Sequence, residues 1–262
     1  MARIDGVVFD IDGVLTTSGR AIAGADRAVE TVRERGLRRV FLTNTTSRSR
    51  ADIAAMLAGC GIPVTPDEIV TAARLTAEYL RGNHPGARCL LLNSGDIGDD
   101  LGSVETVEDG ARPDVVVLGG AGPEFTHLAL SRVVALMLDG VPVVAMHRGL
   151  TWATADGLRI DTGVYLPGME QAANTKITAV GKPSAAGFVT AAASIGVSPH
   201  RLVMIGDDLH SDVLAAQRVG YTGVLVRTGK FRQQTLARAG VAPDHVIDSV
   251  ADLPTLLESL AG

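Results

Sequence analysis

The stretch Val7-Val8-Phe9-Asp10-Ile11-Asp12-Gly13-Val14-Leu15 (residues 7–15) places an apolar run directly before two carboxylates. The apolar run predicts a β-strand buried on both faces, which is typical of a parallel sheet. Residues two apart on an extended segment point the same way, so Asp10 and Asp12 are expected to repel each other unless a cation compensates. Gly13 lets the backbone turn closely past a bound group. This stretch therefore predicts both a sheet strand and a functional edge.

Three further stretches add hydroxyl, cationic and acidic groups after apolar runs. They are Thr43-Asn44-Thr45, Gly181-Lys182-Pro183, and Gly206-Asp207-Asp208 with Asp212 after it. The run before each stretch predicts a strand, and open parallel sheets bind ligands beyond the carboxyl ends of their strands. We therefore expect the four stretches to share one edge of a sheet.

Apolar runs alternate with helical periodicity along the chain, as in the helix expected at residues 212–219. This alternation predicts an α/β fold, a doubly wound parallel sheet. The four stretches come from both ends of the chain, while its middle carries none of them. The economical interpretation is a catalytic core of residues 1–80 and 176–262, with residues 81–175 inserted as an α/β cap domain. Asn83-His84-Pro85-Gly86 is the expected linker into that cap.

Composition limits the class of protein. Of 262 residues, 46% are hydrophobic but only 3% aromatic, so the core must consist mainly of Ala, Val, Leu and Ile. The formal net charge of −5 gives no reason to expect nucleic acid as a partner. No run of about 18 apolar residues and no N-terminal targeting pattern occur, which argues against a membrane span and a signal peptide. Cys60 and Cys89 lack metal-ligand spacing and suit a reducing compartment, so we expect a cytoplasmic protein.

Several carboxylates at one edge require a compensating cation, because like charges close together disfavour ionisation. Oxygen ligands without His or Cys favour Mg²⁺ over zinc. With Mg²⁺, a phosphate ester is the natural substrate, since the ion offsets the repulsion between an anionic nucleophile and an anionic substrate. Asp10 is then the expected nucleophile, which forms an aspartyl-phosphate, and Asp12 protonates the leaving oxygen and later deprotonates water. The alternative is that strand-end aspartates merely cap helices or turns.

The remaining groups suit phosphate binding and support of the metal. Thr43 offers a hydroxyl and the backbone amides near Asn44 offer donors to phosphoryl oxygens, with an ordinary turn as the alternative. Lys182 supplies a fixed positive charge for the transferred group. Asp208 and Asp212 are expected to orient the metal ligands, although Asp212 also opens a predicted helix and suits its dipole.

These stretches resemble the four motifs of the haloacid dehalogenase-like (HAD) hydrolase superfamily, and the resemblance covers nearly the whole chain. Asp10-Ile11-Asp12-Gly13-Val14-Leu15 is similar to the first motif, Thr43-Asn44 to the second, Lys182 to the third, and Gly206-Asp207-Asp208 with Asp212 to the fourth. The resemblance implies that the side chains of Asp10 and Asp207 and the main-chain carbonyl of Asp12 bind Mg²⁺.

The long insertion is similar to the C2-type cap of HAD subfamily IIA. Within it, Val226-Arg227-Thr228-Gly229-Lys230-Phe231-Arg232 resembles the branch that contains phospholysine/phosphohistidine/inorganic pyrophosphate phosphatase and its hydrolase-domain relatives. Some members of that branch carry Ser where this chain has Asp12, so this chain keeps the full acid/base pair. Related capped proteins often dimerise through the cap, so a homodimer is one assembly that the resemblance allows.

The expected cap contains side chains that suit either substrate contact or structure. His147 and Arg148 follow a predicted strand, so they either contact the substrate, with Arg148 pairing with a second anionic group, or form a solvated loop. Trp152 either stacks on a substrate ring or packs within the cap. Asp161 is expected to be a turn residue rather than a substrate contact. Lys230, outside the cap and near the end of a strand, is expected to be an edge residue.

The predicted function is a Mg²⁺-dependent phosphatase whose partner is a small phosphorylated substrate. A phosphomonoester is the general case, and phosphohistidine, phospholysine or pyrophosphate is the narrower one implied by the resemblance. A phosphotransferase or mutase shares every motif, whereas a non-catalytic binding module has no use for the intact set of acids with Lys182. A nucleotide-binding oxidoreductase requires G-x-G-x-x-G after the first strand, where this chain has Asp-Ile-Asp-Gly.

Overall fold

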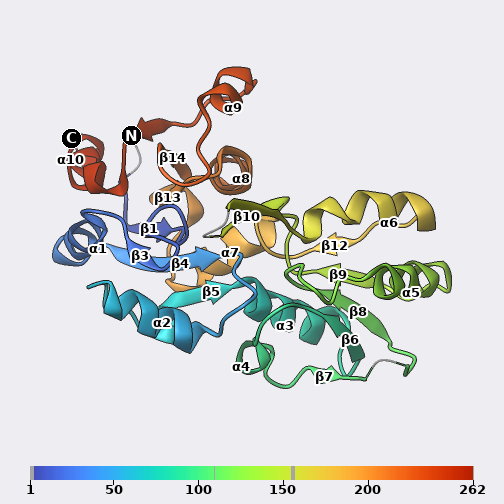
Figure 1. Cartoon of the computed structure of the whole chain (residues 1–262). Coiled ribbons are helices and arrows are strands. Elements are labelled where there is room, and N and C mark those ends of the chain that lie inside the picture. Colours follow the sequence, from blue (N-terminus) through green and yellow to red (C-terminus); the bar gives the residue numbers. More distant parts are fainter. Residues whose placement is uncertain (1–2, 109, 155–156, 262) are drawn as a thin grey trace. The chain divides into compact units, whose positions relative to one another are not determined.

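The computed structural model describes residues 3–108, 110–154 and 157–261. Contacts within the chain divide it into two compact units. The first unit comprises Met1–Thr43, Arg50–Val70 and Ala185–Gly262, and the second comprises Asn44–Ser49 and Thr71–Ser184. Figure 1 labels the helices and strands of both units where there is room.

A six-stranded sheet, in the order β15-β14-β13-β1-β4-β5, forms the centre of the first unit (Figure 1). Its strands are β1 (Gly6–Phe9), β4 (Arg38–Thr43), β5 (Ile69–Thr71), β13 (Leu202–Gly206), β14 (Thr222–Val226) and β15 (His245–Ile247). Strand β1 pairs in parallel with β13 and β4, and β14 pairs in parallel with β13 and β15. The neighbours of β1 thus come from distant parts of the sequence, and Phe9 lies beside both Ile205 and Phe41.

The helices of the first unit bury apolar residues, with the exception of residues 233–238, none of which is buried. They are α1 (Ala25–Glu34), α2 (Arg50–Gly59), α7 (Ala185–Ser194), α8 (Leu214–Val219), α9 (Gln233–Arg238) and α10 (Leu253–Ala261). Shorter elements are the hairpin β2 (Thr16–Thr17) with β3 (Arg20–Ala21), 3-10 turns at Pro66–Glu68, Pro199–Arg201 and Val250–Asp252, and a π-helical turn at Leu209–Val213. Helix α1 shows the pattern: it buries Ala28, Val29 and Val32 on one stripe and ends just before Gly36, whose φ is 67°.

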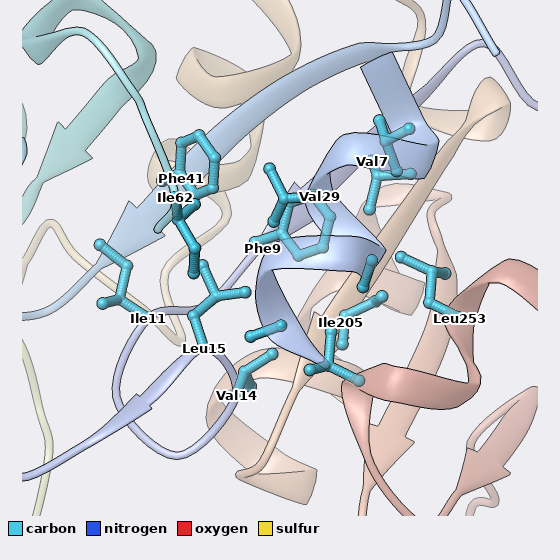
Figure 2. Packing of buried hydrophobic residues seen from close by; sticks show 14 of the residues in the cluster. Val7, Phe9, Ile11, Val14, Leu15, Val29, Phe41, Ile62, Ile205 and Leu253 are labelled. Atoms are coloured by element: carbon cyan, nitrogen blue, oxygen red, sulfur yellow. The ribbon is translucent and has the colours of Figure 1, made fainter. Parts of the chain in front are cut away.

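Aliphatic side chains dominate the core of the first unit, as the composition predicted (Figure 2). Val7, Leu15 and Val29 are buried there beside the stacked rings of Phe9 and Phe41, whose centroids lie 5.6 Å apart. Each fully buried aliphatic side chain contributes about 1.5–3 kcal/mol relative to an exposed one. This packing holds β1 rigidly, and with it the loop that carries the first two acids.

The second unit has its own sheets and its own core. Its five-stranded sheet, in the order β12-β9-β8-β6-β7, consists of β6 (Arg88–Leu92), β7 (Glu105–Thr106), β8 (Val115–Leu118), β9 (Val143–Ala145) and β12 (Thr178–Ala179), all in parallel pairs. An antiparallel hairpin joins β10 (Thr151–Thr154) and β11 (Gly157–Ile160). Its helices are α3 (Ala72–Asn83), α4 (Gly98–Leu101), α5 (His127–Leu138) and α6 (Leu166–Ala173), with a 3-10 turn at Thr162–Val164. Leu118, Val133 and Leu166 are among the buried residues of this core.

The predicted α/β class is confirmed, since parallel sheets with helices form both units. The contact-based boundaries fall after Val70 and Ser184, so residues 71–80 and 176–184 group with the second unit. The division into a catalytic core of 1–80 and 176–262 and a cap of 81–175 stays a prediction. The turn at residues 83–86 joins α3 to β6 inside the second unit, and its role as a linker stays a prediction together with those boundaries. Within the described ranges, every helix is too short or too polar to cross a bilayer.

Candidate active site

Three buried carboxylates gather at the carboxyl ends of adjacent strands in the first unit. Asp10 follows β1, Asp207 follows β13, and Asp212 lies in the π-helical turn after β13. Their exposed fractions are 6%, 2% and 3%, and one oxygen of each lies within 4.8 Å of the others. The parallel pairing of β1 with β13 explains the approach, because residues that follow paired strand ends meet at the same edge.

This gathering of like charges changes the protonation of Asp207. Burial raises the pKa of Asp207, and the negative charges of Asp10 and Asp212 raise it further, against the opposing effects of the Lys230 amide and ammonium, to about 8. An ionised Asp207 at neutral pH therefore needs additional positive charge. Burial disfavours the charged form of Lys230, yet the surrounding carboxylates, led by Asp207 and Asp212, outweigh it and raise the Lys230 pKa.

The donor set fits a hard divalent cation. Carboxylate oxygens are the ligands that Mg²⁺ uses in proteins, and the three acids offer them at close range from rigid elements. Among the described residues, this group contains Asp212, which we expected only to orient ligands, and does not contain the Asp12 side chain. The Asp12 side chain is exposed. The resemblance assigns metal binding to the main-chain carbonyl of Asp12, so that prediction stands untested.

Asp208 organises the turn that brings Asp212 into place. One oxygen of its carboxylate accepts the amides of His210 and Ser211, each at 3.0 Å, and thereby caps the π-helical turn. The amide of Asp208 donates to Asp212 at 3.2 Å. A Cβ added to Gly206 would lie 2.2 Å from that of Asp212, so the turn packs tightly on the end of β13. The helix predicted over 212–219 is therefore wrong at its start: the cap begins a π-helical turn at Leu209, and α8 follows from Leu214.

A segment after β14, residues 228–230, also contacts this edge, and sequence reasoning missed it. The Lys230 amide donates to Asp207 Oδ2 at 2.7 Å, and the Thr228 hydroxyl donates to the Gly13 carbonyl. We expected Lys230 to be an edge residue, and that expectation did not include the bond from its amide to an acid of the cluster. The available signal was the Thr-Gly-Lys sequence, which begins one residue after a buried strand-like run, an arrangement close to that of the other stretches.

The predicted phosphate-binding residues fall in both units. Thr43 is the last residue of β4 in the first unit and is 2% exposed. Asn44 and Lys182 group with the second unit, where the Asn44 side-chain amide donates to the Lys182 carbonyl at 2.9 Å. The Asn44 side chain therefore supports the loop that carries Lys182. The predicted donor to the phosphoryl oxygens is the backbone amide at Asn44, which this side-chain bond does not involve. Phosphate binding by all three residues stays a prediction.

His147 and Arg148 make internal contacts within the second unit. His147 is 2% exposed, its Nδ1 accepts the Gly149 amide at 3.0 Å, and its Nε2 lies 3.8 Å from an Asp161 oxygen. Arg148 pairs with Glu170 and donates to the Ile177 carbonyl at 3.0 Å. The solvated-loop alternative is therefore wrong for His147, which is buried. Contact of either side chain with a substrate stays a prediction.

The other two candidates of the second unit differ in outcome. Asp161 is a turn residue, as predicted: it accepts the amides of Thr162 at 2.8 Å and Ala121 at 3.0 Å at the start of a 3-10 turn. Trp152 lies on β10 with 42% of its surface exposed, so it is not buried in the second unit, and neither of its two expected roles is tested.

Family models match both ends of the chain. A model of haloacid dehalogenase-like hydrolases matches residues 7–106, and a HAD-hydrolase-like model matches residues 179–253. Human phospholysine phosphohistidine inorganic pyrophosphate phosphatase is 33% identical over 98% of this chain and 95% of its own length. Bovine haloacid dehalogenase-like hydrolase domain-containing protein 2 is 33% identical over 93% of this chain and 95% of its own.

Solved structures show the same architecture. The 4-nitrophenylphosphatase of Thermotoga maritima superposes with a TM-score of 0.87 at 28% identity, covering 96% of this chain and 97% of its own. The p-nitrophenyl phosphatase of Archaeoglobus fulgidus gives a TM-score of 0.89 at 25% identity, covering 97% and 100%. Together with the acids at the sheet edge, these likenesses define an α/β phosphatase. The chain belongs to the haloacid dehalogenase-like hydrolase family.

Proposed function

We propose that this phosphatase is Mg²⁺-dependent and hydrolyses small phosphomonoesters through an aspartyl-phosphate on Asp10. The observation that carries the proposal is the group of Asp10, Asp207 and Asp212, buried and within 4.8 Å of one another. Such a group is costly for a folded protein unless a cation compensates it. A structural role alone does not explain why three acids converge there.

The residues of this chain divide the reaction between them. Asp10 attacks phosphorus and forms the acyl-phosphate bond as the bond from phosphorus to the leaving oxygen breaks. Asp12, exposed beside the buried Asp10, donates its proton to that oxygen and then takes a proton from the water that hydrolyses the intermediate. Thr43 and Lys182 bind the phosphoryl oxygens.

Asp10 and Asp207 would hold Mg²⁺ with the Asp12 carbonyl, and Asp212 either binds with them or orients Asp207. When bound, the ion supplies positive charge that neutralises the carboxylates and the phosphoryl group. The names of the relatives suggest the narrower substrates, phospholysine, phosphohistidine and pyrophosphate. Because Asp12 provides a full acid/base group, the leaving group of a phosphomonoester is equally within its reach.

The test is turnover of 4-nitrophenyl phosphate by the purified protein with Mg²⁺ and with a chelator. We expect activity with Mg²⁺ and its loss on chelation. Labelled phosphate should be trapped on the protein after rapid quenching, in a form that hydroxylamine releases, and should be absent from Asp10→Asn. Unchanged activity under chelation contradicts the metal dependence, and phosphate trapped elsewhere contradicts the role of Asp10.

An acceptor screen decides between hydrolysis and transfer. Alcohols and sugar phosphates are added to the same assay, and the products are separated. We expect free phosphate in proportion to nitrophenol. Phosphorylated acceptor as the main product would identify a phosphotransferase or mutase with the same nucleophile.

A further inference from the structure

The segment Thr228-Gly229-Lys230 contacts both acid-bearing loops of the first unit. It follows β14, which pairs with β13 so that Ile205 lies beside Val224. Three adjacent strands, β1, β13 and β14, thus each deliver a loop to the same edge. The first two loops carry the acids, whereas the third contributes backbone and a hydroxyl.

We propose that this segment positions Asp207 for metal binding, with the Lys230 amide and the Thr228 hydroxyl as its positioning groups. The inference rests on the proposed metal-dependent function. It assigns a role to main-chain and hydroxyl groups that do not themselves bind metal but fix those that do.

The first contact fixes the orientation of the Asp207 carboxylate. Its Oδ2 accepts the Lys230 amide at 2.7 Å, which is a short hydrogen bond. A backbone donor cannot change rotamer, so it holds the carboxylate plane in one orientation. The direction of the other carboxylate oxygen of Asp207 is then fixed as well. Less conformational entropy is therefore lost when a ligand binds to that oxygen.

The second contact fixes the turn after Asp10. The Thr228 hydroxyl donates to the Gly13 carbonyl, and Gly13 has a φ of 93° that few other residues adopt. This bond connects the β14 loop to the β1 loop. The loops of Asp10 and Asp207 are therefore fixed relative to each other through residues 228–230, against the repulsion of their charges.

Glycines make both contacts sterically possible. A Cβ added at Gly229 would lie 1.9 Å from Asp207 Oδ2 and 2.6 Å from the Gly13 Cα, and Gly229 itself has a φ of 58°. A Cβ added at Gly13 would likewise lie 1.9 Å from Asp207 Oδ2. Close backbone contact on both sides of one carboxylate is what a positioning device requires, and a larger residue at either glycine displaces Asp207.

The experiment measures Mg²⁺ binding directly, by calorimetry and by the Mg²⁺-dependent rise in Tm, on the full chain. Gly229→Ala should weaken Mg²⁺ binding by about 10- to 100-fold, and Thr228→Val by about 3- to 10-fold. Thr228→Ser keeps the hydroxyl and should restore nearly normal affinity. KM for 4-nitrophenyl phosphate at saturating Mg²⁺ should stay unchanged, because the variants alter the metal and not the substrate contacts.

Controls separate positioning from general damage. Gly59→Ala, in α2 with nothing near the added Cβ, should leave Mg²⁺ affinity unchanged. Where Gly229→Ala fails to fold, the Thr228→Val and Thr228→Ser pair decides the question. A wild-type protein that shows no Mg²⁺ binding overturns the proposed function itself. A wild type that binds Mg²⁺, together with folded Gly229→Ala and Thr228→Val variants that bind it equally well, overturns only the positioning role.

Discussion

Asp207 in the first unit and Glu170 in the second are both buried carboxylates, yet their surroundings act in opposite directions. Burial and two neighbouring acids raise the pKa of Asp207 to about 8. Burial also disfavours the charged form of Glu170, but the Ile177 amide, Arg148 and Lys176 together lower its pKa. Pairing of opposite charges stabilises the second unit, whereas gathering of like charges in the first unit costs stability and offers oxygen ligands for the cation that we propose.

The two regions therefore follow different physical rules. The group around Glu170 is satisfied within the protein: its carboxylate accepts the Ile177 amide at 3.0 Å and pairs with Arg148. The group around Asp207 instead brings three carboxylates together, and we propose that a cation compensates them. The comparison predicts that charge removal affects activity in the first unit and stability in the second, and the following experiments test that contrast.

Asp10→Asn has the largest expected effect. Loss of the nucleophile should reduce kcat by about 10³-fold or more, as for removal of other catalytic nucleophiles. The protein should stay folded and become slightly more stable, because one charge leaves the repelling group. Steady-state turnover of 4-nitrophenyl phosphate and the Tm measure both effects. Near-normal turnover would remove Asp10 from its proposed role.

The second prediction concerns the pH dependence of the metal-free protein. Between the usual aspartate pKa of about 3.9 and the folded value of about 8, folded Asp207 retains a proton that the unfolded chain releases. The free energy of unfolding should therefore fall as pH rises through this window, by about 1.4 kcal/mol for each unit of difference in pKa. Urea unfolding with a chelator at pH 5 and pH 8 measures it.

Two controls accompany that series. Asp207→Asn should flatten the profile, and Mg²⁺ should restore much of the stability of the wild type at pH 8. A chelated wild type that gains stability between pH 5 and pH 8 relative to Asp207→Asn would contradict the raised pKa.

Glu170→Gln tests the opposite behaviour in the second unit. Loss of a charged hydrogen-bond acceptor for Arg148 and Ile177 should reduce stability by about 1–3 kcal/mol. The pKa of Glu170 is lower in the folded than in the unfolded protein, so its carboxylate stabilises the folded state at pH values above the unfolded pKa. This stabilisation is lost as the pH falls through the folded pKa. The difference in stability between wild type and variant should therefore shrink in acid. Urea unfolding at pH 7 and pH 3.5 measures this. Strong loss of kcat with unchanged stability would show that Glu170 serves the reaction instead.

Arg148→Gln has the smallest expected effect. Its guanidinium is partly exposed, so loss of the pair should cost about 1 kcal/mol and should be non-additive with Glu170→Gln. A double-mutant cycle in urea measures this coupling. The KM of the Arg148→Gln variant separates the structural role of Arg148 from a role in substrate binding. An unchanged KM shows that Arg148 serves only as the partner of Glu170, whereas an increased KM shows that it contacts the substrate.

Local patterns predicted most of the elements. The strands of the first unit appear where apolar runs end at polar groups, as in β1 and β13, because burial on both faces requires a continuous run. The turn residues at 83–86 could not fix a domain boundary, because turn residues look the same within a domain and between domains. The helix at 212–219 was wrong only at its start, because the Asp208 cap starts the turn earlier, which depends on a side-chain contact and not on periodicity.

The sequence by itself determined that acids follow buried strands, because the apolar run that forms the strand and the acid after it are adjacent in the sequence. Only the tertiary structure decided which of them meet. The position of Asp212 in the group and the contact of residues 228–230 with Asp207 both depend on the turn after β13 and on the order β14-β13-β1. Strand order follows from packing of the whole sheet, and no local pattern of residues specifies it.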